Sequence, residues 1–316
     1  MTQCQVSTPK CFLGCASQSR VVQTLTREEL LTVWRLTGVA FSYEALGKLI
    51  TVAQVHLYAC SGCGFEFFDP RLAGGDQFYS ELHKKLPGYY APARPENERN
   101  ARFAQEHKFG TILDLGCGTG LALDVARKRG LETFGLEFNH SAAEEARSRG
   151  HTVFAIPIQE LDSRWDGYFD LISLNQLLEH VPDPISLIKN CIRLLSPRGV
   201  IAIAVPGAEG VLRWHPWMAL NWPPHHVSRW RRKDLQLLSE RCGLTVARSG
   251  GNQLLGSELE ETLFANRSHW LALGKMYRGP NPAVIKILGF LYRKTGMKYI
   301  FRSQGHSIFS FLKRKT

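Results

Sequence analysis

Short apolar runs alternate with segments of helical periodicity between residues 105 and 250. The strand-like runs are TILDL, ETFGLE, HTVFAI, FDLISL, VIAIAVP and LTVARS. The segments between them include GLALDVARKRG, SAAEEARSRG, DPISLIKNCIRLLSPRG and RRKDLQLLSERCG, whose apolar residues recur at helical spacing. Strands that alternate with helices predict a parallel sheet with helices on both faces. Because crossover connections are right-handed, we expect an α/β fold with a Rossmann-like, doubly wound, mostly parallel seven-stranded sheet.

Capping patterns mark where two of the predicted helices begin. LTREELLTVWRLTG has Thr26 in the N-cap position and Glu29 three residues later, which is the pattern of a capping box. In SAAEEARSRG, Ser141 and Glu144 stand in the same relation. We therefore expect one helix to begin after Thr26 and another to begin after Ser141.

The composition changes along the chain and indicates four regions. Residues 1–70 form a small Cys-rich segment, in which VHLY and FEFF predict two short strands. Residues 71–104 are rich in Gly, Pro and charge, which is typical of a linker or cap. Residues 105–250 hold the alternating strands and helices. Residues 251–316 show helical patterns and end in GHSIFSFLKRK, which predicts a basic helical insertion and a final strand at an edge of the sheet.

The composition also narrows the class of protein. Of the 316 residues 44% are apolar, which supports a packed core, and no run of eighteen apolar residues predicts a membrane-spanning helix. The N-terminal segment contains no apolar run typical of a secretory signal, so we expect a cytoplasmic protein. The eight cysteines in a chain of this length do not predict a disulfide framework.

The net charge of +11 is concentrated near the C-terminus. Residues 265–316 contain eleven Lys or Arg and no Asp or Glu, so the remaining 28 basic residues balance the 28 acidic ones. Such a basic segment can contact a phosphate-bearing substrate, an anionic membrane surface or nucleic acid, or it can be a solvated face. Because residues 1–264 are neutral overall, they offer no broad basic surface, which disfavours a nucleic-acid partner.

ILDLGCGTG, residues 112–120, combines a strand with a glycine-rich turn before a helix. Glycines let a ligand approach the backbone, and the N-terminus of the helix offers free N–H groups. Leu121 stands where a dinucleotide fingerprint has its third glycine, so the spacing disfavours NAD. The next predicted strand ends at Glu137, about twenty residues further on, where a carboxylate can hold both hydroxyls of a ribose.

The motifs DLGCGTG and GLEFN resemble those of the class I S-adenosylmethionine (SAM) methyltransferases, over residues 105–250. The resemblance implies that SAM is the cofactor, and that Asp114 orders the glycine turn or binds the amino group of SAM. It also implies that Glu137 binds the ribose. The segment CGFEFFDPRLAGGDQFYSEL and the following GYY resemble bacterial methyltransferases that act on sugars, natural products or cell-surface glycans, which implies that Tyr89 and Tyr90 close over SAM. The cofactor-binding residues that it implies are Asp114, Gly116, Cys117, Gly118, Gly120, Glu137, Phe138, Asn175 and Tyr90.

Polar residues follow the apolar strand in SLNQLLEHVPDP, residues 173–184. Open α/β sheets bind their ligands at this position, just beyond the carboxyl ends of the strands. The resemblance implies that Asn175 faces the cofactor. It also implies that Glu179 and His180 match an EH pair that is found in many small-molecule methyltransferases and that borders the acceptor.

A distant histidine is available for this pair. His226 in PPHHVSRW fits the register of the family's segment before a late helix, and His225 is adjacent. In the small-RNA 2′-O-methyltransferases a similar ExxEH, with a distant histidine, binds a divalent metal, but here Gln176 replaces the first glutamate. The candidate catalytic residues are therefore Glu179, His180 and His226. Three roles are open for them: support of the fold, general base catalysis or metal binding.

Two cysteine pairs in the N-terminal region form a second motif. CFLGC contains Cys11 and Cys15, and YACSGCGFEFF contains Cys60 and Cys63. A CxxC pair in a hairpin can provide half of a tetrahedral zinc site. The arrangement resembles the N-terminal zinc-binding segments of bacterial methyltransferases that act on sugars, natural products or cell-surface glycans. It implies a structural zinc ion bound by these four thiols, and the alternative is a set of metal-free thiols.

These patterns together predict a SAM-dependent methyltransferase that acts on a small molecule, with the hydroxyl of a saccharide, glycan precursor or other metabolite as acceptor. The tryptophans of VLRWHPWMALNWPPHH can stack on a sugar ring or form the core of a lid. An RNA methyltransferase and a non-catalytic scaffold are the alternative functions. The basic C-terminal segment allows peripheral contact with a membrane on which an acceptor is carried.

Overall fold

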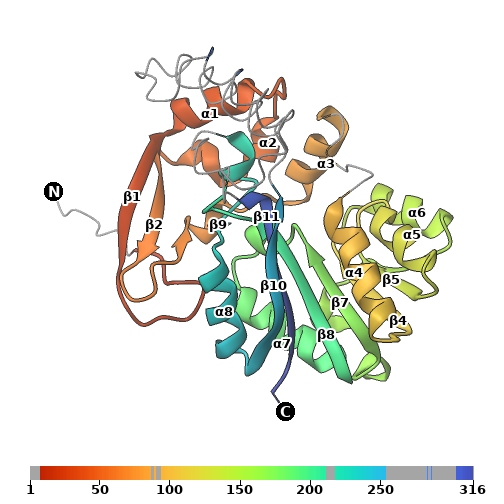
Figure 1. Cartoon of the computed structure of the whole chain (residues 1–316). Helices are drawn as coiled ribbons and strands as arrows, with labels where there is room; N and C mark the ends of the chain where they lie inside the picture. Colours follow the sequence, from red (N-terminus) through yellow and green to blue (C-terminus); the bar gives the residue numbers. More distant parts are fainter. Residues whose placement is uncertain are drawn as a thin grey trace.

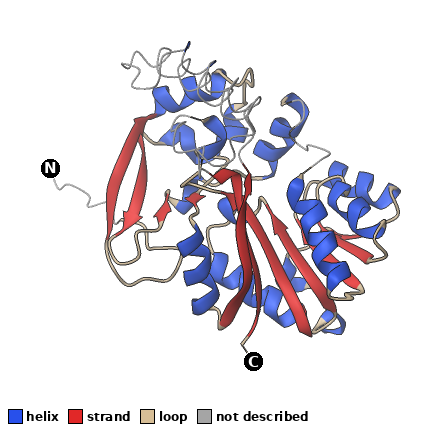
Figure 2. Ribbon diagram, viewed as in Figure 1, coloured by secondary structure: helices blue, strands red, loops and turns tan. Residues whose placement is uncertain are grey.

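The computed structural model describes residues 8–86, 89, 94–210, 218–253, 283, 286 and 304–315. Within these residues the chain forms a seven-stranded sheet and a four-stranded sheet. Figure 1 shows the small N-terminal sheet to the left of the large one, and Figure 2 shows helices packed around both sheets.

The large sheet has the strand order β10-β11-β8-β7-β4-β5-β6. Its strands are β4 (Thr111–Leu115), β5 (Glu132–Leu136), β6 (Thr152–Phe154), β7 (Phe169–Asn175), β8 (Leu195–Pro206), β10 (Leu244–Gln253) and β11 (Gln304–Arg314). Strands β4 to β8 pair in parallel, and β11 pairs antiparallel with β8 and β10. The order reverses between β4 and β7, which leaves a crevice at their carboxyl ends. The predicted Rossmann-like, doubly wound, mostly parallel seven-stranded sheet is confirmed.

Helices cover both faces of this sheet because alternate strand residues point to opposite faces. Ile112 and Leu171 belong to an apolar layer with α4, α5 and α6, whereas Leu113 and Ile172 belong to a layer with α7 and α8. These helices are α4 (Pro95–Glu106), α5 (Leu121–Arg127), α6 (His140–Ser148), α7 (Pro184–Leu194) and α8 (Arg232–Arg241). The near-continuous apolar runs in the sequence are therefore strands that are buried on both faces.

Strand β11 corrects one prediction. The C-terminal strand forms, but it lies between β10 and β8 and is not at an edge of the sheet. Phe311 packs in one apolar layer, while Ile308 and Leu312 pack in the layer on the opposite face. A strand with two apolar faces buries more surface in the interior of a sheet than at its edge.

The small sheet has the order β1-β2-β3-β9 and joins the N-terminal region to the rest of the chain. Its strands are β1 (Ser19–Thr26), β2 (Gln54–Cys60), β3 (Glu66–Phe67) and β9 (Ser228–Arg229), and its helices are α1 (Arg27–Arg35), α2 (Tyr43–Leu46) and α3 (Asp76–Lys85). Short 3-10 helices are η1 (Gly47–Thr51), η2 (Pro70–Leu72), η3 (Ile158–Glu160), η4 (Ser163–Trp165), η5 (Leu178–His180) and η7 (Ala219–Asn221). The predicted strands around VHLY and FEFF correspond to β2 and β3. Because β9 comes from a segment far along the chain, both regions share one sheet.

The two predicted helix starts had different outcomes. Helix α1 begins directly after its N-cap Thr26, as predicted, and the reciprocal hydrogen bonds of its capping box with Glu29 measure 3.1 and 2.9 Å. Helix α6 is capped instead by Asn139, whose Oδ1 accepts the backbone N–H of Ala142 at 3.0 Å. The predicted cap at Ser141 is therefore wrong, because asparagine is an equally good N-cap and stands two residues earlier.

Among the described residues, no helix is both long enough and apolar enough to cross a membrane. The predicted helical insertion and most of the basic C-terminal segment lie outside the described residues. The division into four regions and the cytoplasmic location stay predictions.

Candidate active site

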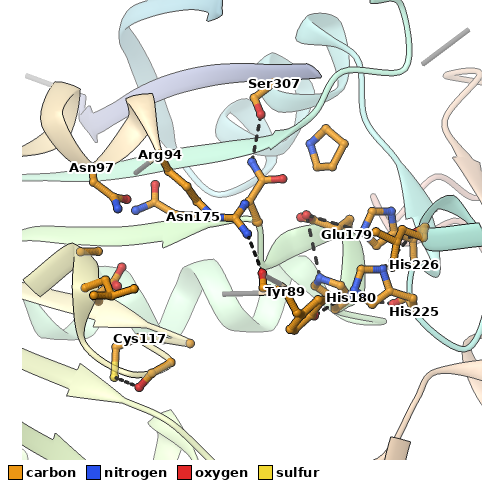
Figure 3. A pocket seen from close by; sticks show the side chains of 18 of the residues that line it. Tyr89, Arg94, Asn97, Cys117, Asn175, Glu179, His180, His225, His226 and Ser307 are labelled. Atoms are coloured by element: carbon orange, nitrogen blue, oxygen red, sulfur yellow. Dashed lines mark hydrogen bonds and ion pairs between the residues drawn. The ribbon is translucent and has the colours of Figure 1, made fainter. Parts of the chain in front are cut away.

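A pocket of about 530 Å³ lies at the crevice where the strand order reverses. This volume is within the range of sites that bind small molecules and cofactors. One end is lined by the glycine turn after β4, and the other by η5 and by residues 218–226. Figure 3 shows Cys117 at the first end, and His180, His225 and His226 gathered at the second.

The glycine turn has the backbone conformation that its sequence requires. Gly116, Gly118 and Gly120 all have positive φ angles, at 70°, 53° and 84°, which other residues rarely adopt. Gly116 and Gly118 line the pocket together with Cys117. Gly120 lies at the start of α5, where an added Cβ would be 2.9 Å from the ring of His151. Gly120 is therefore required for close packing of the helix, while the other two glycines face the pocket.

Two carboxyl groups hold this end of the pocket. Asp114 is buried, accepts a hydrogen bond from Ser173, and has its pKa raised to about 7, chiefly by burial. Glu137 accepts the backbone N–H groups of Gly118 at 2.9 Å and of Asn139 at 2.7 Å. Glu137 thus fastens the glycine turn to the end of β5, and it lies outside the set of residues that line the pocket. Its binding to a ribose stays a prediction.

The residues at this end fit SAM. A buried carboxyl that faces a pocket is complemented by a cationic ligand group, and SAM carries an ammonium and a sulfonium. Asp114 and Asn175 would face these groups, since both line the pocket beside the glycine turn. Phe138 is 57% exposed outside the pocket lining, and Tyr90 lies outside the described residues. The roles of these two aromatic residues stay predictions.

Polar residues at the end of β7 are held by groups from distant segments. Asn175 Oδ1 accepts a hydrogen bond from Asn100 at 3.1 Å. Gln176 has a left-handed backbone conformation, with φ at 54°, which is uncommon outside glycine and is often found at functional sites. Its side-chain amide donates to Ser307 at 3.1 Å and to Glu96 at 3.3 Å.

Three histidines gather at the other end of the pocket, and the Nδ1 atom of each lies beside a carbonyl oxygen. The Nδ1 atom of His180 lies 2.7 Å from the carbonyl oxygen of His225, and that of His225 lies 2.8 Å from the carbonyl oxygen of Leu220. The Nδ1 atom of His226 lies 3.1 Å from the Asn221 side-chain oxygen. Because carbonyl oxygens only accept, each Nδ1 carries the proton and each Nε2 keeps a lone pair. Burial lowers the pKa of all three, that of His180 to about 4, so the imidazoles are neutral at pH 7.

Glu179 lies between two of these rings and is 1% exposed. Neither of its carboxyl oxygens has a hydrogen-bond partner among the described residues. Its Oε1 atom lies 3.9 Å from Nε2 of His180 and 3.9 Å from Nε2 of His226. Burial is the main cause that raises its pKa to about 8. The structure therefore brings together the three predicted catalytic residues, although residues 179 and 226 are far apart in the sequence.

Contacts to this cluster that the sequence did not predict come from Trp34, Tyr79 and Tyr89, which lie in the first two of the four regions. The Tyr79 hydroxyl on α3 lies 3.0 Å from Nδ1 of His180, and the Tyr89 hydroxyl lies 2.9 Å from Nε2 of His225. The Trp34 indole N–H donates to the carbonyl of Pro223 at 3.0 Å, just before the two histidines. No local pattern marks these contacts, because each partner comes from a distant part of the chain.

The four thiols of the N-terminal region also come together as predicted. The sulfur atoms of Cys11, Cys15, Cys60 and Cys63 all lie within 4.8 Å of one another, and those of Cys11 and Cys63 are 3.7 Å apart. Two sulfurs bound to one tetrahedral zinc ion lie roughly 3.8 Å apart, given Zn–S bonds of about 2.3 Å. The donor set therefore fits a structural zinc ion. Arg241 lies 3.7 Å from the Cys15 sulfur and can balance the charge of thiolates.

Trp222 is the tryptophan of the Trp-rich segment VLRWHPWMALNWPPHH that the structure describes. It is fully buried and packs against Phe68, with ring centroids 5.1 Å apart. This tryptophan belongs to the core and does not offer a surface for a sugar ring. Trp214 and Trp217 lie outside the described residues.

Comparison with known proteins identifies the family. The family described as Methyltransferase domain matches residues 83–249, which is more than half of the chain. The chain belongs to this methyltransferase family. Its SAM-binding fold is thus the one that the sequence predicts. The matched residues include the glycine turn and all three candidate catalytic residues, and they do not include the N-terminal thiols.

Curated relatives of this methyltransferase include two proteins named ubiquinone biosynthesis O-methyltransferase. The one from Alkalilimnicola ehrlichii is 31% identical over 156 residues, which is 42% of this chain and 63% of the relative. The one from Bradyrhizobium diazoefficiens is 25% identical over 240 residues, which is 68% of this chain and 91% of the relative. The first match thus spans less than two thirds of that relative's length. Among solved structures, a SAM-dependent methyltransferase from Archaeoglobus fulgidus aligns with a TM-score of 0.46 and 18% identity, covering 69% of this chain and 94% of that one.

Proposed function

We propose that this methyltransferase transfers a methyl group from SAM to a hydroxyl oxygen of a small-molecule acceptor. The observation that carries the proposal is a single pocket with two chemically different ends. One end has glycine backbone and the Asp114 carboxyl, which suit a cationic cofactor. The other end has the buried cluster of Glu179 and three histidines, which suits a hydroxyl that must lose a proton. Relatives named as O-methyltransferases support oxygen as the methylated atom.

The reaction needs alignment and a destination for one proton. SAM supplies a methyl group on a sulfonium, which is a good leaving group. The acceptor oxygen forms a bond to the methyl carbon while the carbon–sulfur bond breaks, its electron pair stays on sulfur, and the hydroxyl proton departs. The Nε2 lone pairs can take this proton directly, or they can hold, together with Glu179, a cation that makes the hydroxyl more acidic. Burial of the cluster also excludes water from the reacting atoms.

The class of acceptor is a narrower proposal. A saccharide, glycan precursor or other hydroxylated metabolite fits a pocket of about 530 Å³ that SAM shares with the acceptor. The core position of Trp222 removes one of the aromatic surfaces that a sugar would have used. An acceptor with an acidic or chelating hydroxyl is therefore tested beside simple sugars.

The first experiment measures the melting temperature of the full chain with increasing S-adenosylhomocysteine, the demethylated product of SAM. We expect a saturable rise, because a ligand that binds only the folded state adds about 2.7 kcal/mol of stability at one hundred times its Kd. Transfer of labelled methyl from SAM into a small-molecule extract then tests the acceptor class, and label that becomes sensitive to ribonuclease would indicate RNA instead. A folded protein that shows no shift and no transfer contradicts the proposed function and favours the scaffold.

A further inference from the structure

We propose that Glu179, His180 and His226 bind a divalent transition-metal ion at the acceptor end of the pocket. Figure 3 shows these side chains turned toward one another, with Glu179 between the two rings. All three residues line the pocket, so an ion among them would be reached by an acceptor. The ion would be separate from one held by the N-terminal thiols, which form a different cluster.

The carboxylate of Glu179 is the strongest single observation. It is 1% exposed, and neither oxygen has a hydrogen-bond partner among the described residues. A buried carboxylate is costly unless it is paired with a cation or hydrogen-bonded. Two imidazole Nε2 atoms lie 3.9 Å from its Oε1 atom, and each keeps a lone pair and cannot donate. Two acceptor nitrogens and a carboxylate that face one point are a set of ligands without their cation.

The partners of the imidazoles support the same conclusion. Histidines that bind metals commonly donate their other ring N–H to a carbonyl or carboxylate, which sets the tautomer and the ring orientation. Nδ1 of His180 has the carbonyl oxygen of His225 as its partner, and Nδ1 of His226 has the side-chain oxygen of Asn221. Both Nε2 atoms are therefore held ready as ligands. A general base requires only one histidine and would leave the Glu179 carboxylate unpaired.

The distances suit an ion after small side-chain movements. Ligand atoms at about 2.1 Å from a tetrahedral zinc ion lie roughly 3.4 Å from one another. The two observed distances of 3.9 Å are therefore about half an ångström longer than a filled site needs. His225 is the neighbouring donor, but its Nε2 atom lies 2.9 Å from the Tyr89 hydroxyl, so we assign it to positioning rather than to the ligand set. Gln176 is not a ligand either, since its amide donates to Ser307.

The ligand types select the class of metal. Two imidazoles and one carboxylate suit zinc, manganese or ferrous iron, whereas magnesium and calcium prefer oxygen ligands throughout. Three protein ligands also leave at least one position open toward the pocket, as in catalytic metal sites. Through that position the ion would lower the pKa of an acceptor hydroxyl, a role that rests on the proposed function, whereas binding of the ion does not.

The test measures metal uptake by the full chain. Chelator-treated protein is loaded with zinc or manganese, and its metal content is determined by mass spectrometry. We expect the wild type to hold one equivalent of metal more than either Glu179→Gln or His226→Asn. The control is Glu160→Gln, which changes an exposed carboxylate on η3 and should hold as much metal as the wild type. Loading with cobalt adds a spectroscopic readout, because thiolate-bound cobalt gives strong charge-transfer absorption that nitrogen and oxygen ligands lack. The extra equivalent should lack this absorption.

Equal metal content in the wild type and both variants would overturn the proposal. The melting shift with S-adenosylhomocysteine checks that each variant is folded, since the cofactor end of the pocket is not altered. If a variant does not fold, the wild type alone decides, because it must bind a cobalt ion that shows no thiolate absorption. Metal uptake and cofactor binding without methyl transfer would contradict only the proposed function. Full methyl transfer by protein that lacks the extra ion would overturn only the role of the ion in the reaction.

Discussion

The backbone conformation of single residues shapes the cofactor end of the pocket. Gly118 has a φ of 53°, lines the pocket and donates its N–H to Glu137 at 2.9 Å. A side chain here would occupy ligand space and would also meet the strain that left-handed backbone imposes on a β-branched residue, on the order of 1–3 kcal/mol. These two effects can be separated, because the chain offers a glycine with similar backbone strain outside the pocket.

We expect Gly118→Val to abolish the melting shift with S-adenosylhomocysteine. The matched control is Gly130→Val, since Gly130 also has a positive φ, at 84°, and an added Cβ there meets nothing within 4 Å. Both variants should melt at a lower temperature than the wild type, but only the Gly130 variant should keep the ligand-induced shift. A normal shift in the Gly118 variant would show that the turn is not the cofactor site.

At the scale of elements, short helices of the N-terminal region place side chains at the acceptor end. Helix α3 carries Tyr79, whose hydroxyl contacts His180, and it is joined to the start of α2 by Glu81. The Glu81 carboxylate accepts the backbone N–H of Ser42 at 3.0 Å and its hydroxyl at 2.6 Å, and pairs with Lys85 at 2.9 Å. These groups, with the Ser42 hydroxyl first, lower the pKa of Glu81 to about 2.

This lowered pKa predicts a dependence of stability on pH. The folded-state pKa of about 2 lies below the ordinary value of 4.5, so the contribution of Glu81 is present above pH 4.5 and is lost as the pH falls toward 2. We expect Glu81→Gln to lower the free energy of unfolding by about 1–2 kcal/mol at pH 7 and by much less near pH 3. Urea titrations at both pH values measure the difference. An equal loss at both would show that the charge of Glu81 is not the source.

At the scale of the whole molecule, the thiol cluster and the histidine segment are connected through the small sheet. Cys60 ends β2, which pairs with β3, and β3 pairs with β9 directly after the histidines. Val227 follows the histidines, and its N–H donates to the carbonyl of Glu179 at 2.8 Å while its carbonyl accepts from Phe68 at 2.9 Å. The N-terminal region therefore supports the acceptor end, whereas the cofactor end belongs to the large sheet.

We expect Cys60→Ser to release the metal of the thiol cluster and to lower the melting temperature by about 5 °C or more, since 1 kcal/mol corresponds to roughly 2–4 °C in larger domains. Amide hydrogen exchange should become faster in β3 and β9, and the melting shift with S-adenosylhomocysteine should remain. Cys242→Ser changes a half-buried thiol outside the cluster and is the control. Unchanged metal content and unchanged exchange in the Cys60 variant would contradict this connection.

The sequence by itself determined those features that depend on residues close together in the chain. The alternating apolar runs predicted the large sheet, because strand and helix periodicities repeat within a few residues. The turn after β4 was predicted from three glycines, and the start of α1 from Thr26 and Glu29, for the same local reason. The predicted cap of α6 was wrong because Asn139 and Ser141, two positions apart, are both good N-cap residues.

Tertiary structure alone decided which distant residues meet. The resemblance to known methyltransferases indicated Glu179, His180 and His226 as candidate catalytic residues. Their orientation, the Glu179 carboxylate without a hydrogen-bond partner among the described residues, and the contact of His180 with Tyr79 follow from the packing of two sheets. The interior position of β11 likewise depends on which strands offer partners on both of its sides. Local patterns record the propensity and polarity of a segment, whereas burial and hydrogen-bond partners are set by elements far away in the sequence. The chemistry of the acceptor end is therefore a property of the folded chain.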